Sequence, residues 1–180
     1  MPTAGQEIVV HDGRFVRLAR RGAWEYATRP NATGVVAIVA QHDDGRLVLV
    51  EQARPPIGAR VIELPAGLAG DDGSAESMLA AAQRELAEET GYVAASWTRL
   101  GDALSSPGLT DERITFFHAT RLSRDAGTGG GVDGEEIVVH EVPIDEVPDR
   151  LVAWRDRGMA IDMKLLAGLY AEVVLNNREA

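Results

Sequence analysis

Three glutamates near the middle of the chain have the spacing of a chemical site. They are Glu85, Glu88 and Glu89, within the stretch 84–89 that reads Arg-Glu-Leu-Ala-Glu-Glu. On an α-helix, residues at i, i+3 and i+4 share one face, so the three carboxylates would lie close together. Their mutual repulsion would be relieved by a hard divalent cation such as Mg²⁺, which prefers carboxylate oxygens and shares its ligand shell with phosphates. A solvated helix face is the alternative, since glutamate is a favoured surface residue in helices.

The helix that must carry these glutamates is predicted to run from about Ser74 or Ala75 to Thr90. Ser74 is expected to cap its start, and Gly91 occupies the position at which a glycine commonly ends a helix. The apolar stripe expected on its inner face consists of Leu79, Ala82 and Leu86.

Strands are predicted before and after this helix. Asp12-Gly13 is a strong hairpin signal, and the apolar run 34–41 is typical of a strand buried on both faces. The expected strands cover residues 8–11, 14–20, 24–29, 34–41, 46–52, 61–64, 97–100, 114–122 and 137–142. Pro-Ala-Gly at 65–67 is expected to end the strand 61–64, and the chain is expected to be helical from Ile161 to Val174, where apolar residues recur every four positions. Because strands and helices alternate, we expect an α/β fold with a mixed sheet and helices on its faces.

Composition limits the classes of function. The 180 residues can bury the core of one domain, and no apolar run or leader predicts a membrane span or secretion. The chain has no cysteine, which excludes disulfides and thiolate chemistry and favours a cytoplasmic location. A net charge of −10 argues against nucleic acid or an anionic membrane as partner. A phosphorylated small molecule remains possible if a metal cation lies between the two negative partners.

A longer pattern surrounds the glutamates. Its fixed positions are Gly70, Glu76, Arg84, Glu85, Glu88, Glu89 and Gly91, with the aliphatic Leu86 among them. This spacing resembles the Nudix box, and a chance match is on the order of 10⁻⁸ per window if each fixed residue occurs at about 7%. The box usually closes with an aliphatic residue, whereas this chain has Tyr92 there.

The resemblance to Nudix hydrolases implies a fold and a division of the chain. The fold would be a Nudix-type α/β/α sandwich with a mixed sheet, preceded by an N-terminal antiparallel β hairpin or sheet. Residues 1–32 would form an N-terminal β-strand region for dimerisation and base contacts, and residues 33–180 the Nudix hydrolase domain. The family also implies a homodimer in which both chains build each site.

The resemblance assigns roles within the box. Two or three Mg²⁺ ions, or Mn²⁺ ions, would be held by the three box glutamates, with Glu88 also a candidate for proton transfer. Arg84 and Glu76 would form an ion pair that orients the glutamate helix. Gly70 and Gly91 would serve backbone geometry.

Two segments outside the box narrow the resemblance to ADP-ribose and related nucleotide-sugar pyrophosphatases. Residues 63–67, Glu-Leu-Pro-Ala-Gly, lead into the box, and Pro107 lies fifteen residues beyond Tyr92, where this subfamily carries a marker proline. The subfamily completes its metal shell with a backbone carbonyl from the first segment. Ala66 matches by motif, and Ala69 is the alternative because the box begins at Gly70.

A catalytic base is expected from a later loop in this subfamily. The glycine-rich stretch 127–134, interpreted as flexible, contains Asp133 and is followed by Glu135 and Glu136. We take Glu135 as the first candidate and Glu136 as the second. A mobile acidic loop would suit a part that closes over substrate, and a solvated loop is the alternative.

Substrate contacts are assigned on the same resemblance. Trp24 would stack on the nucleobase, or else pack in the core as tryptophan commonly does. Arg54 and Arg29 would bind phosphate, because a guanidinium matches phosphate oxygens with two hydrogen bonds. Glu112 would hydrogen-bond the terminal ribose or its equivalent.

The expected activity is metal-dependent hydrolysis of the pyrophosphate bond of ADP-ribose, giving AMP and ribose 5-phosphate. GDP-mannose or a broad range of nucleotide sugars are the alternative substrates. An alternative of another class is a non-catalytic regulator that binds nucleotides on a Nudix fold; the complete set of box glutamates argues against it.

Overall fold

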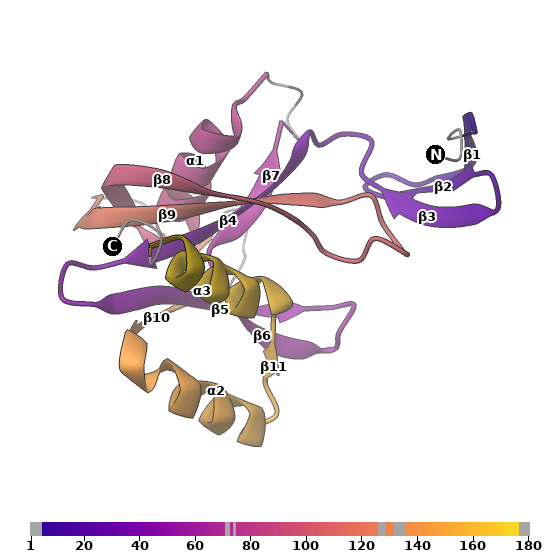
Figure 1. Cartoon of the computed structure of the whole chain (residues 1–180). Helices are drawn as coiled ribbons and strands as arrows, with labels where there is room; N and C mark the ends of the chain where they lie inside the picture. The colour runs from indigo at the N-terminus through magenta and orange to yellow at the C-terminus, as the bar shows by residue number, and fades with distance from the viewer. Residues whose placement is uncertain (1–4, 71–72, 74, 126–128, 132–135, 177–180) are drawn as a thin grey trace.

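The computed structural model describes residues 5–70, 73, 75–125, 129–131 and 136–176, with side chains up to residue 171. Two separate sheets and three α-helices are seen in this part of the chain (Figure 1). The first sheet contains β1 (Glu7–Asp12), β2 (Arg17–Arg21) and β3 (Trp24–Thr28). The second contains β4 (Gly34–Gln41), β5 (Arg46–Arg54), β6 (Ala59–Glu63), β7 (Ala66–Ala69), β8 (Tyr92–Leu104), β9 (Arg113–Arg124), β10 (Val138–Pro143) and β11 (Ala160–Ile161). The helices are α1 (Met78–Thr90), α2 (Val147–Asp156) and α3 (Met163–Asn176), with a 3₁₀ turn at Ile144–Glu146.

The larger sheet has the strand order β11-β6-β5-β4-β9-β8, with β10 paired to β5 and β7 paired to β4. The pairs β4–β9 and β6–β11 are parallel, and the other pairs are antiparallel. The expectation of a mixed sheet is therefore confirmed.

The central strand β4 explains the layered architecture. Its six residues from Val35 to Ala40 are buried in succession, so both faces of the strand are covered. Alternate residues of a strand point to opposite faces, and two core clusters follow that rule. Val35, Ala37 and Val39 pack with α2 and α3, whereas the residues between them pack with α1. The result is the expected α/β/α sandwich, with α1 and α3 on opposite sides of the sheet (Figure 1).

Helix α1 begins later than expected. Ser77, and not Ser74, is the N-cap: its hydroxyl accepts the backbone N–H of Ala80 at 3.1 Å. Ser74 itself lies outside the described residues. Glu76 therefore precedes the helix, where its side chain can turn back toward Arg84.

Four elements were not expected from the sequence, namely β7, the 3₁₀ turn at Ile144–Glu146, α2 and β11, and β8 is longer than expected. The strand expected at 61–64 ends before Pro65, since β6 ends at Glu63, but the short strand β7 that follows and pairs with β4 was not expected. Helix α2 buries only Val147 and Trp154, which is too weak a pattern to be recognised from periodicity. Strand β8 extends well beyond the expected 97–100, because pairing with β9 continues past a bulge at Arg99/Gly101.

The small N-terminal sheet lies beside the larger one (Figure 1). It joins the loop that precedes β9, where the N–H of Ala27 donates to the carbonyl of Leu109 at 2.8 Å. Several of its apolar side chains are exposed, namely those of Ile8, Val9, Val10, Phe15, Val16, Leu18 and Trp24. None of the helices in the described part of the chain has the length and apolar character needed to cross a bilayer.

Candidate active site

A cavity of about 1030 Å³ lies between the glutamate helix and the β5–β6 hairpin. It has two walls of different charge. The helix wall is formed by Glu85, Glu88 and Glu89 of α1, together with Arg84 and residues 66–68. The hairpin wall contains the side chains of Gln52, Arg54, Arg60 and Glu63, with the loop 55–57 at its tip. The cavity is also lined by Arg29, Val35, Glu112, Glu136, Asp162 and Lys164.

Glu89 is the most enclosed of the three helix glutamates, with 6% of its surface exposed. Its carboxylate accepts the backbone N–H of Ala66 at 3.0 Å and the side-chain amide of Gln52 at 3.4 Å. Burial raises the pKa of Glu89 to about 8, and the nearby negative charges of Glu85 and Glu63 act in the same direction. The site therefore disfavours the ionised form of Glu89 unless positive charge is added.

Arg84 holds the helix wall together. Its guanidinium donates to Glu85 at 2.8 Å and to Glu88 at 2.9 Å, and it pairs with Glu76 at 3.2 Å. It also donates to the carbonyl of Leu68 at 2.9 Å, which fixes the helix against β7. The ion pair between Arg84 and Glu76 expected from the sequence is thus present, and the same guanidinium serves two more carboxylates. Burial would lower the pKa of Arg84, but these carboxylates outweigh it and raise the pKa.

The helix wall fits a divalent cation by its chemistry. Its ligands are hard carboxylate oxygens, which suit Mg²⁺ or Mn²⁺. Gly67 leaves room for them: a Cβ at this position would lie 2.0 Å from the carboxylate of Glu85. Among the described residues no three acidic or histidine side chains are already gathered as a metal cluster. Glu85 and Glu88 are instead bound by Arg84. A cation would compete with Arg84 for these oxygens and would favour the ionised form of Glu89.

The structure favours Ala66 over Ala69 as the source of a backbone ligand. Ala66 lines the cavity, and its N–H already contacts Glu89. Ala69 is fully buried, and its carbonyl accepts both the N–H and the hydroxyl of Thr33, at 2.8 and 3.0 Å. The carbonyl of Ala69 already accepts two hydrogen bonds and is therefore less suited to bind a metal ion.

The hairpin wall pairs its charges fully. Arg54 donates two hydrogen bonds to Glu63, at 2.6 and 2.9 Å, and Glu63 is 1% exposed. Lys164 approaches Glu63 at 3.7 Å. Arg60 binds Glu51, which also contacts His140 at 2.8 Å. Of these residues, the sequence analysis had singled out only Arg54 as a site residue, because the partners come from other strands.

The remaining expected substrate contacts are divided by the structure. Arg29 and Glu112 lie together, 3.2 Å apart, at the edge of the cavity. They also line a smaller neighbouring cavity of about 250 Å³. Trp24 does not line the large cavity and is 67% exposed, so the alternative of core packing for Trp24 is wrong within one chain.

One candidate for the catalytic base lies at the cavity, and both box glycines have the left-handed backbone conformation. Glu136 lines the cavity and its side chain is exposed, while Glu135 lies outside the described residues. Gly91 ends α1 in the left-handed conformation, with φ of 70°, and its N–H donates to the carbonyl of Ala87 at 2.8 Å. Gly70 also has φ of 70°, a conformation that glycine adopts without strain.

Comparison with known proteins agrees with this geometry. Residues 29–161 match the NUDIX domain model, and the chain belongs to the Nudix family. It is 35% identical over 138 residues to an ADP-ribose pyrophosphatase of Mycobacterium tuberculosis, covering 77% of this chain and 64% of that protein. It is 36% identical over 121 residues to a GDP-mannose pyrophosphatase of Pectobacterium atrosepticum, covering 63% and 60%. The chain thus spans slightly less than two thirds of these relatives.

A solved structure supports the same fold. The crystal structure of an ADP compounds hydrolase superposes with a TM-score of 0.75 and 20% identity. The match covers 99% of this chain and 96% of that one. The similarity therefore includes the N-terminal sheet as well as the sandwich.

Proposed function

We propose that this protein is a metal-dependent hydrolase that cleaves the pyrophosphate bond of ADP-ribose, or of a closely related nucleoside diphosphate sugar. The observation that carries the proposal is the opposition of the two cavity walls. Carboxylates that suit divalent cations face the guanidinium groups of Arg54 and Arg60 across one cavity. A diphosphate needs both kinds of contact, cations for its charge and arginines for its oxygens. The ADP-ribose pyrophosphatase of M. tuberculosis supports the choice of substrate.

Glu85, Glu88, Glu89 and the carbonyl of Ala66 would hold two or three Mg²⁺ or Mn²⁺ ions. When bound, these ions would offset the charge between the carboxylates and the diphosphate and make a water molecule easier to deprotonate. Arg84 would keep the helix glutamates together while exchanging some of its contacts with the cations. Its link to Leu68 would keep the helix in place during that exchange.

The chain's own residues would orient the substrate and move the proton. Arg54, aligned by its two hydrogen bonds to Glu63, would bind a phosphate, with Arg29 beside it. Glu112 would accept a hydroxyl of the sugar. Water would attack one phosphorus, and the bond from that phosphorus to the bridging oxygen would break. AMP and ribose 5-phosphate would each keep one phosphate. The water's proton would pass to Glu135, our first candidate for the base, or to Glu136 or Glu88.

A homodimer is part of the proposal. A three-stranded sheet with exposed apolar residues on all its strands is weakly stable alone and is expected to be covered. A second copy of the chain would cover it and would bring Trp24 to the partner's cavity, where an indole can stack on a base. Sedimentation velocity would test this assembly: a dimer that Trp24→Ala leaves intact but that binds ADP-ribose more weakly would support it. A monomer at micromolar concentration would contradict it.

Substrate choice is tested by a hydrolysis panel containing ADP-ribose, GDP-mannose, UDP-glucose and 8-oxo-dGTP. We expect release of AMP from ADP-ribose with the highest kcat/KM in Mg²⁺, and none in chelator. A preference for GDP-mannose would favour the second candidate, for which the P. atrosepticum relative is the support. Nucleotide binding without turnover of any compound would favour the regulator and contradict the proposal.

A further inference from the structure

The C-terminal end of α1 is capped by residues 129–131, which lie between β9 and β10 in the chain. The last carbonyl groups of an α-helix have no partner within the helix. Here the carbonyl of Glu88 accepts the N–H of Gly131 at 3.0 Å, and that of Glu89 accepts the N–H of Gly130 at 3.1 Å. The following two carbonyls, of Thr90 and Gly91, accept Arg124 Nη1 at 3.3 Å and the N–H of Asp125 at 2.9 Å.

This capping requires close approach of two backbones. A Cβ on Gly129 would lie 2.9 Å from the nitrogen of Gly91 and 3.1 Å from the carbonyl carbon of Thr90. The residue also has φ of +110°, which disfavours other residue types. The glycine-rich stretch was expected to be flexible, but its described part, residues 129–131, is docked on the helix that carries the proposed metal ligands.

The same segment leads to the cavity. The carbonyl of Gly130 accepts the N–H of Ile137 at 3.4 Å. Glu136, the preceding residue, lines the cavity, and its carbonyl accepts Arg60 Nη2 at 3.3 Å. Gly130 therefore connects the backbone of Glu89 directly to the residue pair 136–137.

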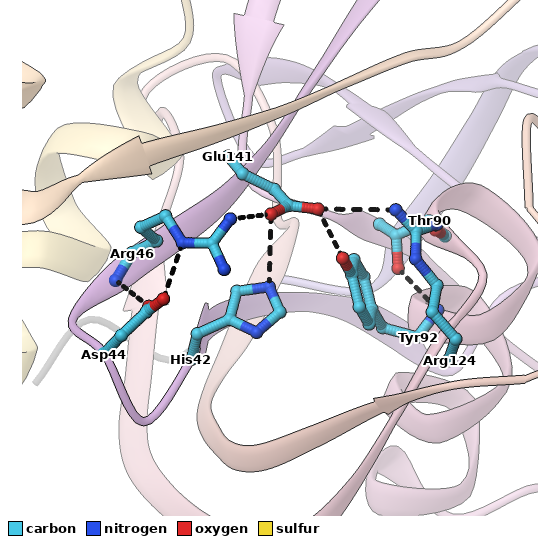
Figure 2. A network of polar contacts seen from close by, with 7 residues as sticks. All are labelled: His42, Asp44, Arg46, Thr90, Tyr92, Arg124 and Glu141. Carbon is cyan, nitrogen blue, oxygen red and sulfur yellow. Dashed lines mark hydrogen bonds and ion pairs between the residues drawn. The ribbon is translucent and has the colours of Figure 1, made fainter.

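A side-chain hydrogen bond also links the end of α1 to β10. Tyr92, the first residue after the cap of α1, donates its hydroxyl to Glu141 on β10 (Figure 2). Arg46 and Arg124 bind the same carboxylate, the latter at 3.3 Å. The guanidinium of Arg124 also lies over the Tyr92 ring, 4.1 Å from its centroid, and the ring of His42 meets it edge-on at 4.9 Å. An aliphatic residue, which the Nudix box usually has at this position, could not make the hydrogen bond.

We propose that Tyr92 and Glu141 are positioning residues for hydrolysis. Their hydrogen bond completes a ring that runs from α1 through Gly130 to residues 136–137, along β10 to Glu141, and back to Tyr92. The ring sets the place of Glu136 relative to Glu88 and Glu89. A hydrogen bond to a carboxylate is stronger than one between neutral groups, which suits it to hold a strand against a helix. The inference rests on the proposed function for its kinetic consequence, and on the fold alone for its structural one.

The kinetic test uses Tyr92→Phe, which keeps the ring contacts and removes only the hydroxyl. We expect kcat for ADP-ribose to fall about 10-fold, the usual scale for losing a group that orients a ligand, while KM changes less than about twofold. Glu141→Gln, which also loses the charge that Arg46 and Arg124 bind, should lower kcat at least as much, and adding Tyr92→Phe to it should cause less than the full loss seen in the single variant. Tyr170→Phe, on an exposed tyrosine of α3, is the control and should match wild type.

A coupling experiment separates positioning from general stability. In a Glu135→Gln, Glu136→Gln background, both acidic candidates that follow the glycine-rich stretch are absent. Tyr92→Phe should then cause no further loss of kcat, because the carboxylate of Glu136, whose place the ring sets, is absent. An equal loss in both backgrounds, or a change in KM alone, would overturn the proposal.

Amide hydrogen exchange provides a measurement that does not depend on activity. Exchange at Gly130 and Gly131 should be about 10-fold faster in Tyr92→Phe and in Glu141→Gln than in wild type, because their acceptors on α1 are held less firmly. Unchanged exchange would contradict the ring. An enzyme inactive on every substrate would refute the proposed function, and this test of the ring would remain decisive.

A second pair of variants tests the docked glycines. Gly129→Ala and Gly130→Ala both place alanine at positive φ, +110° and +92°, so both carry backbone strain. Only the alanine at position 129 would meet the backbone of α1, since nothing lies within 4 Å of a Cβ on Gly130. We expect Gly129→Ala to lower kcat at least 5-fold more than Gly130→Ala, on the same 10- to 100-fold scale for positioning groups. Equal effects would show that strain alone matters.

Discussion

The pKa values of buried carboxylates shift in opposite directions at the two walls of the cavity. Beside the hairpin wall, Glu51, the partner of Arg60, is 7% exposed; burial alone would raise its pKa, but His140 and Arg60 hold the pKa below its usual range. On the helix wall, Glu89 is 6% exposed and its pKa is raised to about 8, chiefly by burial. The difference has two sources: Glu89 is buried more deeply, and Glu51 has Arg60 and His140 as direct partners.

The carboxylates in and beside the hairpin wall each have a cationic partner, whereas the carboxylates of the helix wall outnumber theirs. Glu63 and Glu51 each have an arginine of their own, whereas Glu76, Glu85 and Glu88 share Arg84. Unbalanced negative charge at a cavity costs stability when the protein is free of metal. The same imbalance provides the attraction for a divalent cation, so the comparison marks the helix wall as the place where the chemistry would occur.

The largest expected effect is on activity. Glu88→Gln and Glu89→Gln, each folded, should lower kcat/KM for ADP-ribose by about 10³-fold, because removing a metal ligand forfeits several kcal/mol of charge stabilisation. Steady-state kinetics at saturating Mg²⁺ would measure this. Near wild-type rates in both variants would contradict the assignment of the helix wall.

Glu89→Gln should also change the pH dependence of stability in chelator. The pKa of Glu89 is raised from 4.5 to about 8 in the folded protein, so its favourable contribution is complete below pH 4.5 and is lost as the pH rises toward 8. Wild type should therefore lose stability relative to Glu89→Gln over this range, by a few kcal/mol, at most roughly 5. Urea unfolding at pH 5 and pH 8.5 would show it. A constant difference between the two proteins would mean that Glu89 is ionised throughout.

Removing a charge from the hairpin wall should lower the stability of the protein, whereas Glu89→Gln should raise it at high pH. Arg54→Ala leaves the buried charge of Glu63 with Lys164 as its remaining cation and should destabilise the fold by about 3 kcal/mol at pH 7. Urea unfolding would measure this change, with Glu89→Gln as the contrasting variant. We expect Arg54→Ala, Glu63→Gln to recover part of the loss, because the uncompensated charge is removed. An additive outcome would show that the pair does not act as a unit.

The smallest effect concerns the start of the helix that carries the unbalanced wall. Ser77→Ala removes the hydroxyl that caps α1 and should cost about 1 kcal/mol of stability. Ser74→Ala provides the comparison and should be close to neutral. A larger loss at position 74 than at position 77 would place the helix start where the sequence had suggested it.

Features that depend on neighbouring residues in the sequence could be predicted, whereas features that depend on contacts between distant segments could not. The three glutamates were predicted to share a face, and they line one wall, because helical spacing is a local property. The start of the helix was misplaced by three residues, because both Ser74 and Ser77 can cap and only packing selects one. Strand β7 was missed, because its pairing with β4 determines it more than its own sequence does.

The sequence by itself determined the presence of the box helix α1, its carboxylate face and its ending at Gly91. Each of these follows from residue type and short-range spacing. Only the tertiary structure decided which charges meet: Arg29 with Glu112, Arg54 with Glu63, and Tyr92 with Glu141. It also decided that the backbone of residues 129–131 caps the glutamate helix. The partners in these three pairs lie up to 83 residues apart and are brought together by strand pairing and layer packing, so no local pattern along the chain predicts them.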